Sequence, residues 1–269
     1  MSDIKPLFRW AGSKKKILSV LSQYWRSDFN RYIEPFAGSA QLFFHLQPQR
    51  AIISDVNSDL ISTYKTIKQF PRQVFNLYNK LPADAKTYYK VREEVKLSLP
   101  PIEKAGYFIY LNRNCFNGIY RVNQRGEFNV PFSNNTGVRK INWSDWKIST
   151  SLLRKARFES KDFESLVRRN LRPNDFVYLD PPYALENRRI FTQYSTASFG
   201  LDDLERLKVL LTFIDESGAH FVLSYASSEE GTYLKKGWNS DEIVINRNIA
   251  GFSQNRRLEK EILITNINV

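Results

Sequence analysis

The strongest local signal in the sequence is Asp175-Phe176-Val177-Tyr178-Leu179-Asp180-Pro181-Pro182-Tyr183. Its apolar run predicts a buried strand that ends at Asp180. Ligands of open α/β sheets bind at the carboxyl ends of the strands, which makes Asp180 a candidate site residue. The two prolines fix φ and remove two backbone donors, which holds the neighbouring carbonyl in one direction. The stretch thus offers a carboxylate, a rigid carbonyl and an aromatic ring close together. This set suits a planar group bearing an NH2, such as a base edge. The alternative is a turn that only ends the strand.

Strand and helix patterns alternate on both sides of this stretch. Helices are expected over residues 39–46, with Ser39 as N-cap, over 201–214, and after Asn57 or Ser58. Strands are expected at residues 31–34, 51–54, 175–179, 219–224, 243–245 and 261–264. The last two are close enough in sequence to pair antiparallel. The alternation predicts an α/β fold with a doubly wound, mostly parallel sheet.

The alternation lapses between about residues 70 and 146. This part carries helical patterns, followed by a segment rich in Asn, Gly and Arg. Within that segment, residues 119–122 and 127–130 predict a β-hairpin around a glycine-containing turn. We therefore expect an inserted module of helices and a hairpin within a split α/β domain.

The positive charge is concentrated in this module. The 269 residues hold 40 Lys and Arg against 28 Asp and Glu, a net charge of +12. Between Lys104 and Arg157 there are ten basic residues and two acidic ones, with Trp143 and Trp146 among them. Such an excess indicates binding to nucleic acid or to an anionic membrane, or else a basic surface that only keeps the protein soluble. The clustering of basic residues with aromatic ones favours nucleic acid.

Composition excludes several other classes of site. The single cysteine, Cys115, rules out an intrachain disulfide and a Cys-based zinc site, and two distant histidines do not predict a metal centre. No apolar run is long enough to span a membrane, and the first residues are not a signal peptide. We expect a cytoplasmic, soluble globular protein without a metal.

A glycine turn follows the first predicted strand. Gly38 would let the backbone approach a ligand closely at this strand-to-helix turn. The turn lacks the G-x-G-x-x-G pattern of dinucleotide sites, so NAD is a poor fit. Asp55 ends the next strand, where an acid can bind ribose hydroxyls.

These segments together resemble the DNA adenine methylase (Dam) family. Residues 180–183 resemble the catalytic motif of amino-methyltransferases that use S-adenosylmethionine, and residues 34–40 resemble their cofactor turn. Residues 9–14 and 116–132 resemble the N-terminal box and the recognition hairpin of the Dam family. The resemblance runs in the family's order along almost the whole chain. It departs at Ser13, where the family has Gly, and at Ser133-Asn134-Asn135, where the family commonly has Gly-Arg/Lys-Tyr.

The resemblance implies a methyltransferase sheet with an inserted target-recognition domain. Residues 1–58 and 155–269 would form the domain that binds S-adenosylmethionine, and residues 59–154 the target-recognition domain, with its DNA-reading hairpin near residues 116–135. The implied catalytic residues are Asp180, Pro181, Pro182 and Tyr183.

The resemblance also implies two binding sets. The cofactor set is Trp10, Ala11, Gly12, Lys14, Glu34, Pro35, Phe36, Gly38, Ser39, Asp55, Asp162, Phe163 and Asp180. The DNA-binding set is Arg9, Phe116, Asn117, Arg121, Asn123, Arg125, Pro131, Asn134, Asn135, Arg139 and Lys140. For Asp162 a helix N-cap is the alternative role.

The implied activity is transfer of a methyl group to the N6 amine of a flipped adenine in a short duplex DNA site such as GATC, by a monomer. Asp180 and the Pro181 carbonyl would accept the two amine hydrogens, and Tyr183 would stack on the base. Phe191, Tyr194 and Phe199 would form a lid, or only pack in their loop. An RNA adenine methyltransferase, an inactive DNA-binding relative and a cytosine-N4 methyltransferase remain the alternatives.

Overall fold

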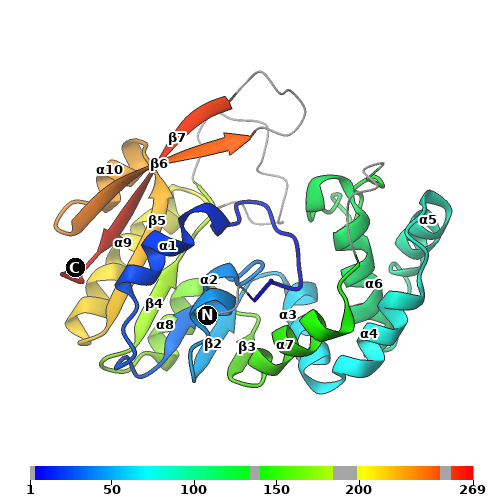
Figure 1. The fold of residues 1–269 in the computed structure, drawn as a ribbon. Coiled ribbons are helices and arrows are strands. Elements are labelled where there is room, and N and C mark those ends of the chain that lie inside the picture. The colour runs from blue at the N-terminus through cyan, green and yellow to red at the C-terminus, as the bar shows by residue number, and fades with distance from the viewer. Residues whose placement is uncertain (1–3, 134–139, 184–198, 249–255, 269) are drawn as a thin grey trace.

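A single sheet of seven strands organises the molecule (Figure 1). The computed structural model describes residues 4–133, 140–183, 199–248 and 256–268. The strands are β1 (Tyr32–Glu34), β2 (Ala51–Ser54), β3 (Ala156–Glu159), β4 (Phe176–Leu179), β5 (His220–Ala226), β6 (Asn239–Asn248) and β7 (Arg256–Thr265). Their order is β3-β2-β1-β4-β5-β7-β6, with the first five parallel and β7 antiparallel to both neighbours. The predicted doubly wound, mostly parallel α/β sheet is confirmed.

Helices cover both faces of this sheet and extend beyond one of its ends. The α-helices are α1 (Leu18–Leu21), α2 (Gln41–Leu46), α3 (Ser58–Gln69), α4 (Pro71–Lys80), α5 (Ala85–Glu94), α6 (Pro101–Asn114), α7 (Trp143–Leu153), α8 (Phe163–Asn170), α9 (Leu201–Glu216) and α10 (Glu229–Leu234). Short 3-10 helices are η1 (Lys15–Ile17), η2 (Ser22–Tyr24) and η3 (Phe116–Gly118). In Figure 1, α4 to α7 lie together beyond β3, and β6 and β7 lie at the opposite end of the sheet.

Two hydrophobic cores sandwich the sheet because side chains alternate between its faces. In β1, Tyr32 belongs to one core and Ile33 to the other. Ile33 lies beside Ile52 of β2 and Val177 of β4, and this core is closed by α8 and α9. The other core runs on from the sheet, without a break, into α3 to α7. The helical lobe therefore shares its core with the sheet.

The strand order reverses between β1 and β4. The chain proceeds from β1 outward through β2 and β3, and from β4 outward in the other direction through β5. Ligands of doubly wound sheets bind outside the carboxyl ends of the strands at such a switch point. Glu34 ends β1 there, and Asp180 follows β4.

Three local expectations need correction. Ser39 does not cap α2, because a tight turn in which the Ala40 amide donates to the Ala37 carbonyl at 2.6 Å delays the helix to Gln41. The N-cap is Ala40, in a left-handed conformation and with no side-chain cap. The short edge strand β3 was not predicted. The predicted hairpin pairs only through isolated bridges, Val122 with Phe128 and Cys115 with Phe132, rather than through regular strands.

Trp146 of α7 anchors the helical lobe. Its side chain is fully buried, and its indole Nε1 donates to the Pro71 carbonyl at 2.9 Å. The ring packs beside Phe75 and Tyr78 of α4. Loss of this side chain removes both a large apolar contact and a buried hydrogen bond.

We predict that Trp146→Ala lowers the free energy of unfolding by about 3–5 kcal/mol, the usual cost of a cavity of that size. Because the lobe and the sheet share a core, denaturant unfolding followed by circular dichroism should remain one cooperative transition. Ile148→Ala, on the same helix but 43% exposed, is the control and should cost far less. Two separate transitions in the Trp146 variant would contradict the shared core.

Candidate active site

Four polar side chains gather where the central strands end. Glu34 and Asp180 come from β1 and from the end of β4, Asp55 follows β2, and Ser224 lies near the end of β5. Parallel packing brings these positions to one edge of the sheet. The sequence predicted three of them, and Ser224 was missed.

The Lys14 ammonium is the centre of this group. Its Nζ lies 3.1 Å from Asp180 Oδ1, 3.0 Å from Glu261 Oε1 and 3.1 Å from the Tyr183 hydroxyl. An ammonium has three donors, so these three acceptors match its full capacity. The Lys14 side chain is only 5% exposed. Burial lowers the pKa of Lys14, but its anionic and hydroxyl neighbours outweigh this and raise it overall, which keeps the ammonium charged.

The described hydrogen-bond donors to the Asp180 carboxylate contact only its Oδ1. Its Oδ1 accepts from Lys14 and also from Ser224 Oγ at 3.0 Å. Because Ser224 donates to Asp180, the Tyr178 hydroxyl must donate to Ser224 across their 3.1 Å contact. No described residue hydrogen-bonds Oδ2. The carboxylate is thus oriented through Oδ1, and within the described part of the chain its other oxygen can accept from an external donor.

Burial raises the pKa of Asp180 above its ordinary value, and the Lys14 ammonium opposes this shift. Burial also raises the pKa of Glu34 well above its usual range. Glu34 is 2% exposed, so the loss of solvation favours the neutral form of its carboxyl. Asp180, by contrast, has a cation beside it that supports its charge.

The glycine turn after β1 is fixed by Asp55. The Gly38 amide donates to Asp55 Oδ2 and the Asn57 amide donates to Oδ1, both at 2.9 Å. Gly38 has a φ of +48°, and a Cβ built on it would lie 2.5 Å from Trp10 Cδ1. The turn thus requires glycine because of both its conformation and the indole against it. The structure brings the predicted Trp10, Gly38 and Asp55 together.

An aromatic wall adjoins this turn. Phe36 and Phe163 stack with centroids 5.1 Å apart, and Phe199 lies 6.1 Å and 6.0 Å from them. Phe199 therefore packs with residues of the predicted cofactor set. Phe191 and Tyr194, the other two predicted lid residues, lie outside the described residues.

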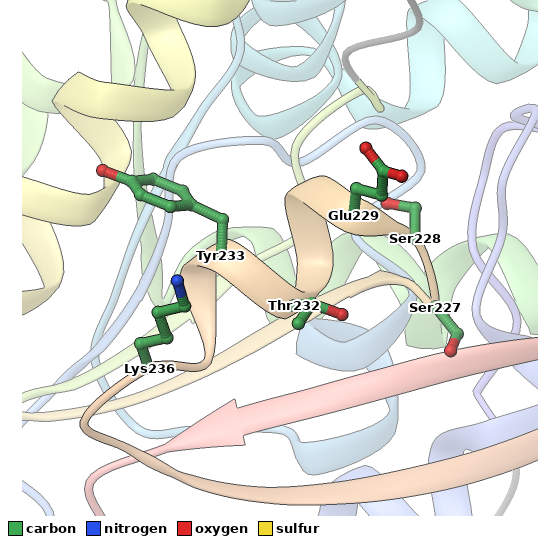
Figure 2. Close-up of a pocket in the computed structure, with 6 residues that line it drawn as sticks. All are labelled: Ser227, Ser228, Glu229, Thr232, Tyr233 and Lys236. Carbon is green, nitrogen blue, oxygen red and sulfur yellow. The ribbon is translucent and has the colours of Figure 1, made fainter.

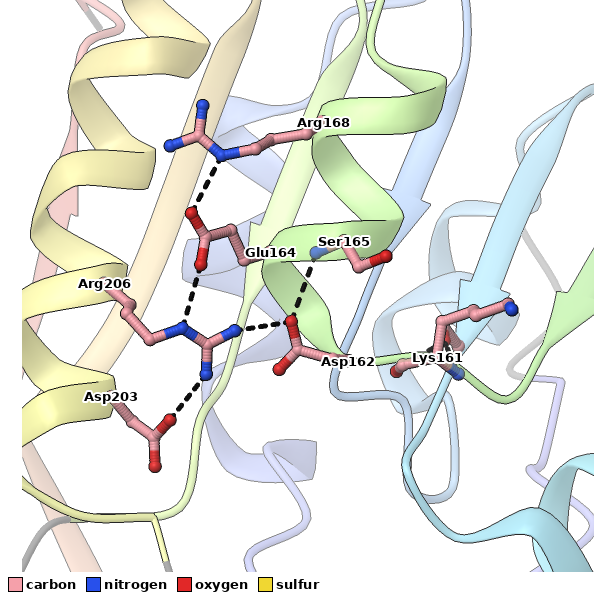
Figure 3. Close-up of polar contacts among 8 residues, drawn as sticks. Lys161, Asp162, Glu164, Ser165, Arg168, Asp203 and Arg206 are labelled. Carbon is pink, nitrogen blue, oxygen red and sulfur yellow. Dashed lines mark hydrogen bonds and ion pairs between the residues drawn. The ribbon is translucent and has the colours of Figure 1, made fainter.

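Arg206 of α9 lies beside this wall and pairs with three acidic side chains, which Figure 3 shows. Its guanidinium contacts Asp162 at 2.6 Å, Glu164 at 2.8 Å and Asp203 at 2.7 Å, and lies 4.7 Å from the Phe163 ring centroid. Asp162 also caps α8, because its Oδ1 accepts from the Ser165 amide. The N-cap role weighed for Asp162 is thus confirmed, and its Oδ2 keeps no bond to a described residue.

The remaining predicted cofactor residues surround the same edge. Pro35 and Ser39 are buried beside the turn, whereas Ala11 and Gly12 are exposed in the segment before Lys14. In the catalytic motif Pro181 is buried and Pro182 is exposed. A separate cavity of about 350 Å³ lies beside α10 and contains none of the predicted site residues (Figure 2). It is lined by Ser227, Ser228, Glu229, Thr232, Tyr233 and Lys236.

The predicted DNA-reading hairpin is organised by Asn123. Its Oδ1 accepts from the Arg125 and Glu127 amides, and its Nδ2 donates to Glu127 Oε2. Across the hairpin, Arg121 Nε donates to Asn129 Oδ1 at 2.8 Å. Asn123 therefore shapes the loop, while Arg125 is exposed on it.

Other predicted DNA-binding residues lie around the base of the hairpin. Phe116 and Asn117 are exposed in η3, and Pro131 is exposed nearby. The Arg9 backbone forms two hydrogen bonds with the Asn112 side chain of α6. Lys140 donates to two carbonyls at the end of α4, so the structure gives it a helix-capping role. Asn134, Asn135 and Arg139 lie outside the described residues.

Three site residues were missed by sequence reasoning. Glu261 was taken only as the first residue of a strand, Ser224 only as the last residue of a strand, and Arg206 as part of a helix. An acid beginning an otherwise apolar strand is the one signal that could have pointed to Glu261. Among the described residues no group of His, Cys, Asp and Glu could hold a metal ion. No described helix has the length and apolar character needed to cross a membrane.

Several known proteins are similar to this chain in sequence. A type II methyltransferase, M1.LlaDCHI of Lactococcus lactis subsp. cremoris, is 32% identical over 277 residues, which covers 98% of this chain and 96% of the relative. M.MjaIII of Methanocaldococcus jannaschii, also a type II methyltransferase, is 32% identical over 270 residues, covering 92% and 93%. A DNA adenine methylase of Escherichia coli is 31% identical over 245 residues, covering 88% and 85%.

A family profile described as D12 class N6 adenine-specific DNA methyltransferase matches residues 10–249. This match spans the Trp10 segment, the glycine turn, the hairpin and the catalytic motif. The predicted resemblance to DNA adenine methylases is confirmed. The chain therefore belongs to the D12 class of N6 adenine-specific DNA methyltransferases.

Proposed function

We propose that the protein transfers the methyl group of S-adenosylmethionine to the N6 amine of an adenine flipped out of a short duplex DNA site. The observation that carries this proposal is the geometry of Asp180. Its Oδ1 is anchored by Lys14 and Ser224, and its Oδ2 accepts no hydrogen bond from any residue that the structure describes. An exocyclic amine supplies a donor for this oxygen.

The residues at the switch point fit the cofactor. Both Asp55 oxygens accept one backbone amide each, and a carboxylate oxygen has a second lone pair for a ribose hydroxyl. Phe36 and Phe163 offer an aromatic wall for the adenine ring, and Asp162 Oδ2 can accept from its amine. When bound, S-adenosylmethionine supplies an electrophilic methyl group on a sulfonium.

Asp180 would contribute to the reaction by orienting the adenine amine. The lone pair of that amine is delocalised into the ring, so it is a weak nucleophile. Asp180 Oδ2 and the Pro181 carbonyl accept its two hydrogens and draw the nitrogen toward tetrahedral geometry. Preorganised acceptors of this kind lower the barrier because they need no rearrangement during the reaction. The proton leaves after transfer, so Asp180 need not remove it first.

The DNA side of the proposal rests on the hairpin. Flipping exposes the base to Tyr183, and Phe116 and Arg125 are exposed beside the hairpin to contact the duplex. Arg121, held by Asn129, is proposed to read a guanine, as a bidentate arginine does in the major groove. A GATC site would supply such a guanine.

We predict that Asp180→Ala lowers the single-turnover rate of methyl transfer by about 10³-fold or more, because the amine loses its oriented acceptor. The assay is incorporation of labelled methyl from S-adenosylmethionine into unmethylated duplex DNA, with duplex RNA in parallel. Asp202→Ala, which removes an exposed acid of α9, is the control and should retain activity. Substantial turnover by the Asp180 variant would remove this residue from the mechanism, and RNA as the better substrate would overturn the choice of DNA.

We predict that Gly38→Ala weakens binding of S-adenosylmethionine at least ~10-fold, since strain at a positive φ costs about 1–3 kcal/mol and the new methyl group displaces Trp10. Isothermal titration calorimetry without DNA measures this directly. Gly237→Ala is the matched control, because its φ is +91° but nothing lies within 4 Å of the added Cβ. Equal affinity in both variants would place the cofactor away from this turn.

We predict that Arg121→Ala relaxes the requirement at one base position by about 1–3 kcal/mol, or roughly 10- to 100-fold in relative rate. The measurement compares methylation of duplexes that differ at each base pair of the recognised site. Uniformly weaker methylation with unchanged discrimination would instead make Arg121 a phosphate contact.

A further inference from the structure

Glu261 is a buried acid whose only predicted role was to begin a strand. Its side chain is 3% exposed, and its Oε1 accepts from Lys14 at 3.0 Å and from the Tyr183 hydroxyl at 3.2 Å. It thus touches both residues that flank the Asp180 carboxylate. Burying a carboxylate is costly unless charged and polar partners compensate it, so its place here needs an explanation.

We propose that Glu261 is a positioning residue of the methyl-transfer reaction, which fixes Lys14 and Tyr183 and through Lys14 orients Asp180. The proposal rests on the function proposed above. It also assigns the Lys14 ammonium to the catalytic side of the site, rather than to the cofactor.

The backbone explains why Glu261 can act as the anchor. Lys14 precedes η1, and Tyr183 lies in the loop after β4, so neither is held in a strand. Glu261 lies within β7, opposite Ala226 of β5 on one side and Ile243 of β6 on the other. Residues on rigid elements hold a site more precisely than residues on loops.

The donor count explains why Lys14 serves Asp180. All three ammonium hydrogens have acceptors in Asp180, Glu261 and Tyr183, which leaves none for a cofactor carboxylate. If Glu261 lost its charge, Lys14 would turn toward Asp180 and the shared geometry would change. Misplacement by about 1 Å can cost up to roughly 100-fold in rate.

Charge gives Glu261 a second effect on the reaction. Glu261 lies beside the Lys14–Asp180 ion pair, and the adenine nitrogen becomes positive as the methyl group arrives. Among the described residues, the other titratable groups that face Asp180 are Glu34 and Tyr32 of β1, Tyr178 of β4 and Tyr183. Burial raises the pKa of each of these four groups.

The test compares Glu261→Gln, Lys14→Met and the double variant with the wild-type protein. Glu242→Gln is the control, because Glu242 also pairs with a lysine in the β6–β7 hairpin but lies on the surface. Single-turnover methylation of DNA, calorimetric binding of S-adenosylmethionine and the pH dependence of the rate are measured for each protein.

We expect Glu261→Gln to slow methyl transfer roughly 10- to 100-fold while affinity for S-adenosylmethionine stays within about 3-fold. Lys14 lowers the pKa of Asp180 and Glu261 raises it, although burial is the largest effect. The acid limb of the rate profile should therefore move to lower pH in Glu261→Gln and to higher pH in Lys14→Met. The slowing in the double variant should be smaller than the product of the two single effects, because Glu261 and Lys14 act on Asp180 as one contact network.

Normal methyl transfer by Glu261→Gln, or a loss confined to cofactor affinity, would overturn the positioning role. So would an acid limb that stays in place in both single variants, since a purely structural acid would not move it. If the wild-type protein itself transfers no methyl group to DNA, the proposed function fails instead, and the two failures are told apart by the wild-type assay.

Discussion

The buried ion pair between Lys14 and Asp180 is the contact on which the site depends. It joins the N-terminal segment to the end of β4, and Glu261 extends it to β7. Burial raises the pKa of Asp180, and the Lys14 ammonium opposes this shift. The pair therefore supports the charge of a partly buried carboxylate and fixes its Oδ1. The fold thus brings together Lys14, Asp180 and Glu261, which are far apart in sequence, and the Lys14 ammonium contacts both carboxylates.

The N-terminal segment also connects the sheet to the helical lobe. Trp10 packs against the Gly38 turn on one side and stacks on Tyr120 at 5.5 Å on the other. Tyr120 directly precedes Arg121 in the hairpin. The two Arg9 bonds to Asn112 fasten the same segment to α6. The glycine turn and the hairpin therefore both contact one short stretch of chain.

Local patterns predicted the sheet well where burial is continuous. The second strand is observed at the predicted residues 51–54, because all four residues are buried and leave no ambiguity about its ends. Asn57 caps the following helix as expected, since its side chain accepts from the Leu60 amide. The edge strand β3 was missed because its residues alternate between buried and exposed and its run is short.

The candidate site was predictable in part. Asp180, Gly38 and Asp55 stand at strand ends, and such positions follow from the order of elements along the chain. The partners of Lys14 do not, because Glu261 lies 247 residues away and only the finished sheet brings it near. An acid in a strand usually indicates an exposed position. Its burial here follows from a tertiary contact that no local pattern carries.

We propose that the site around Asp180 methylates adenine in DNA. The most direct measurement is long-read sequencing of DNA from a host that lacks adenine methylation and expresses the protein. We expect N6-methyladenine within one short sequence motif and none elsewhere. Unmodified adenine throughout, from a folded protein that binds S-adenosylmethionine, or modification at cytosine N4 instead, would contradict the account.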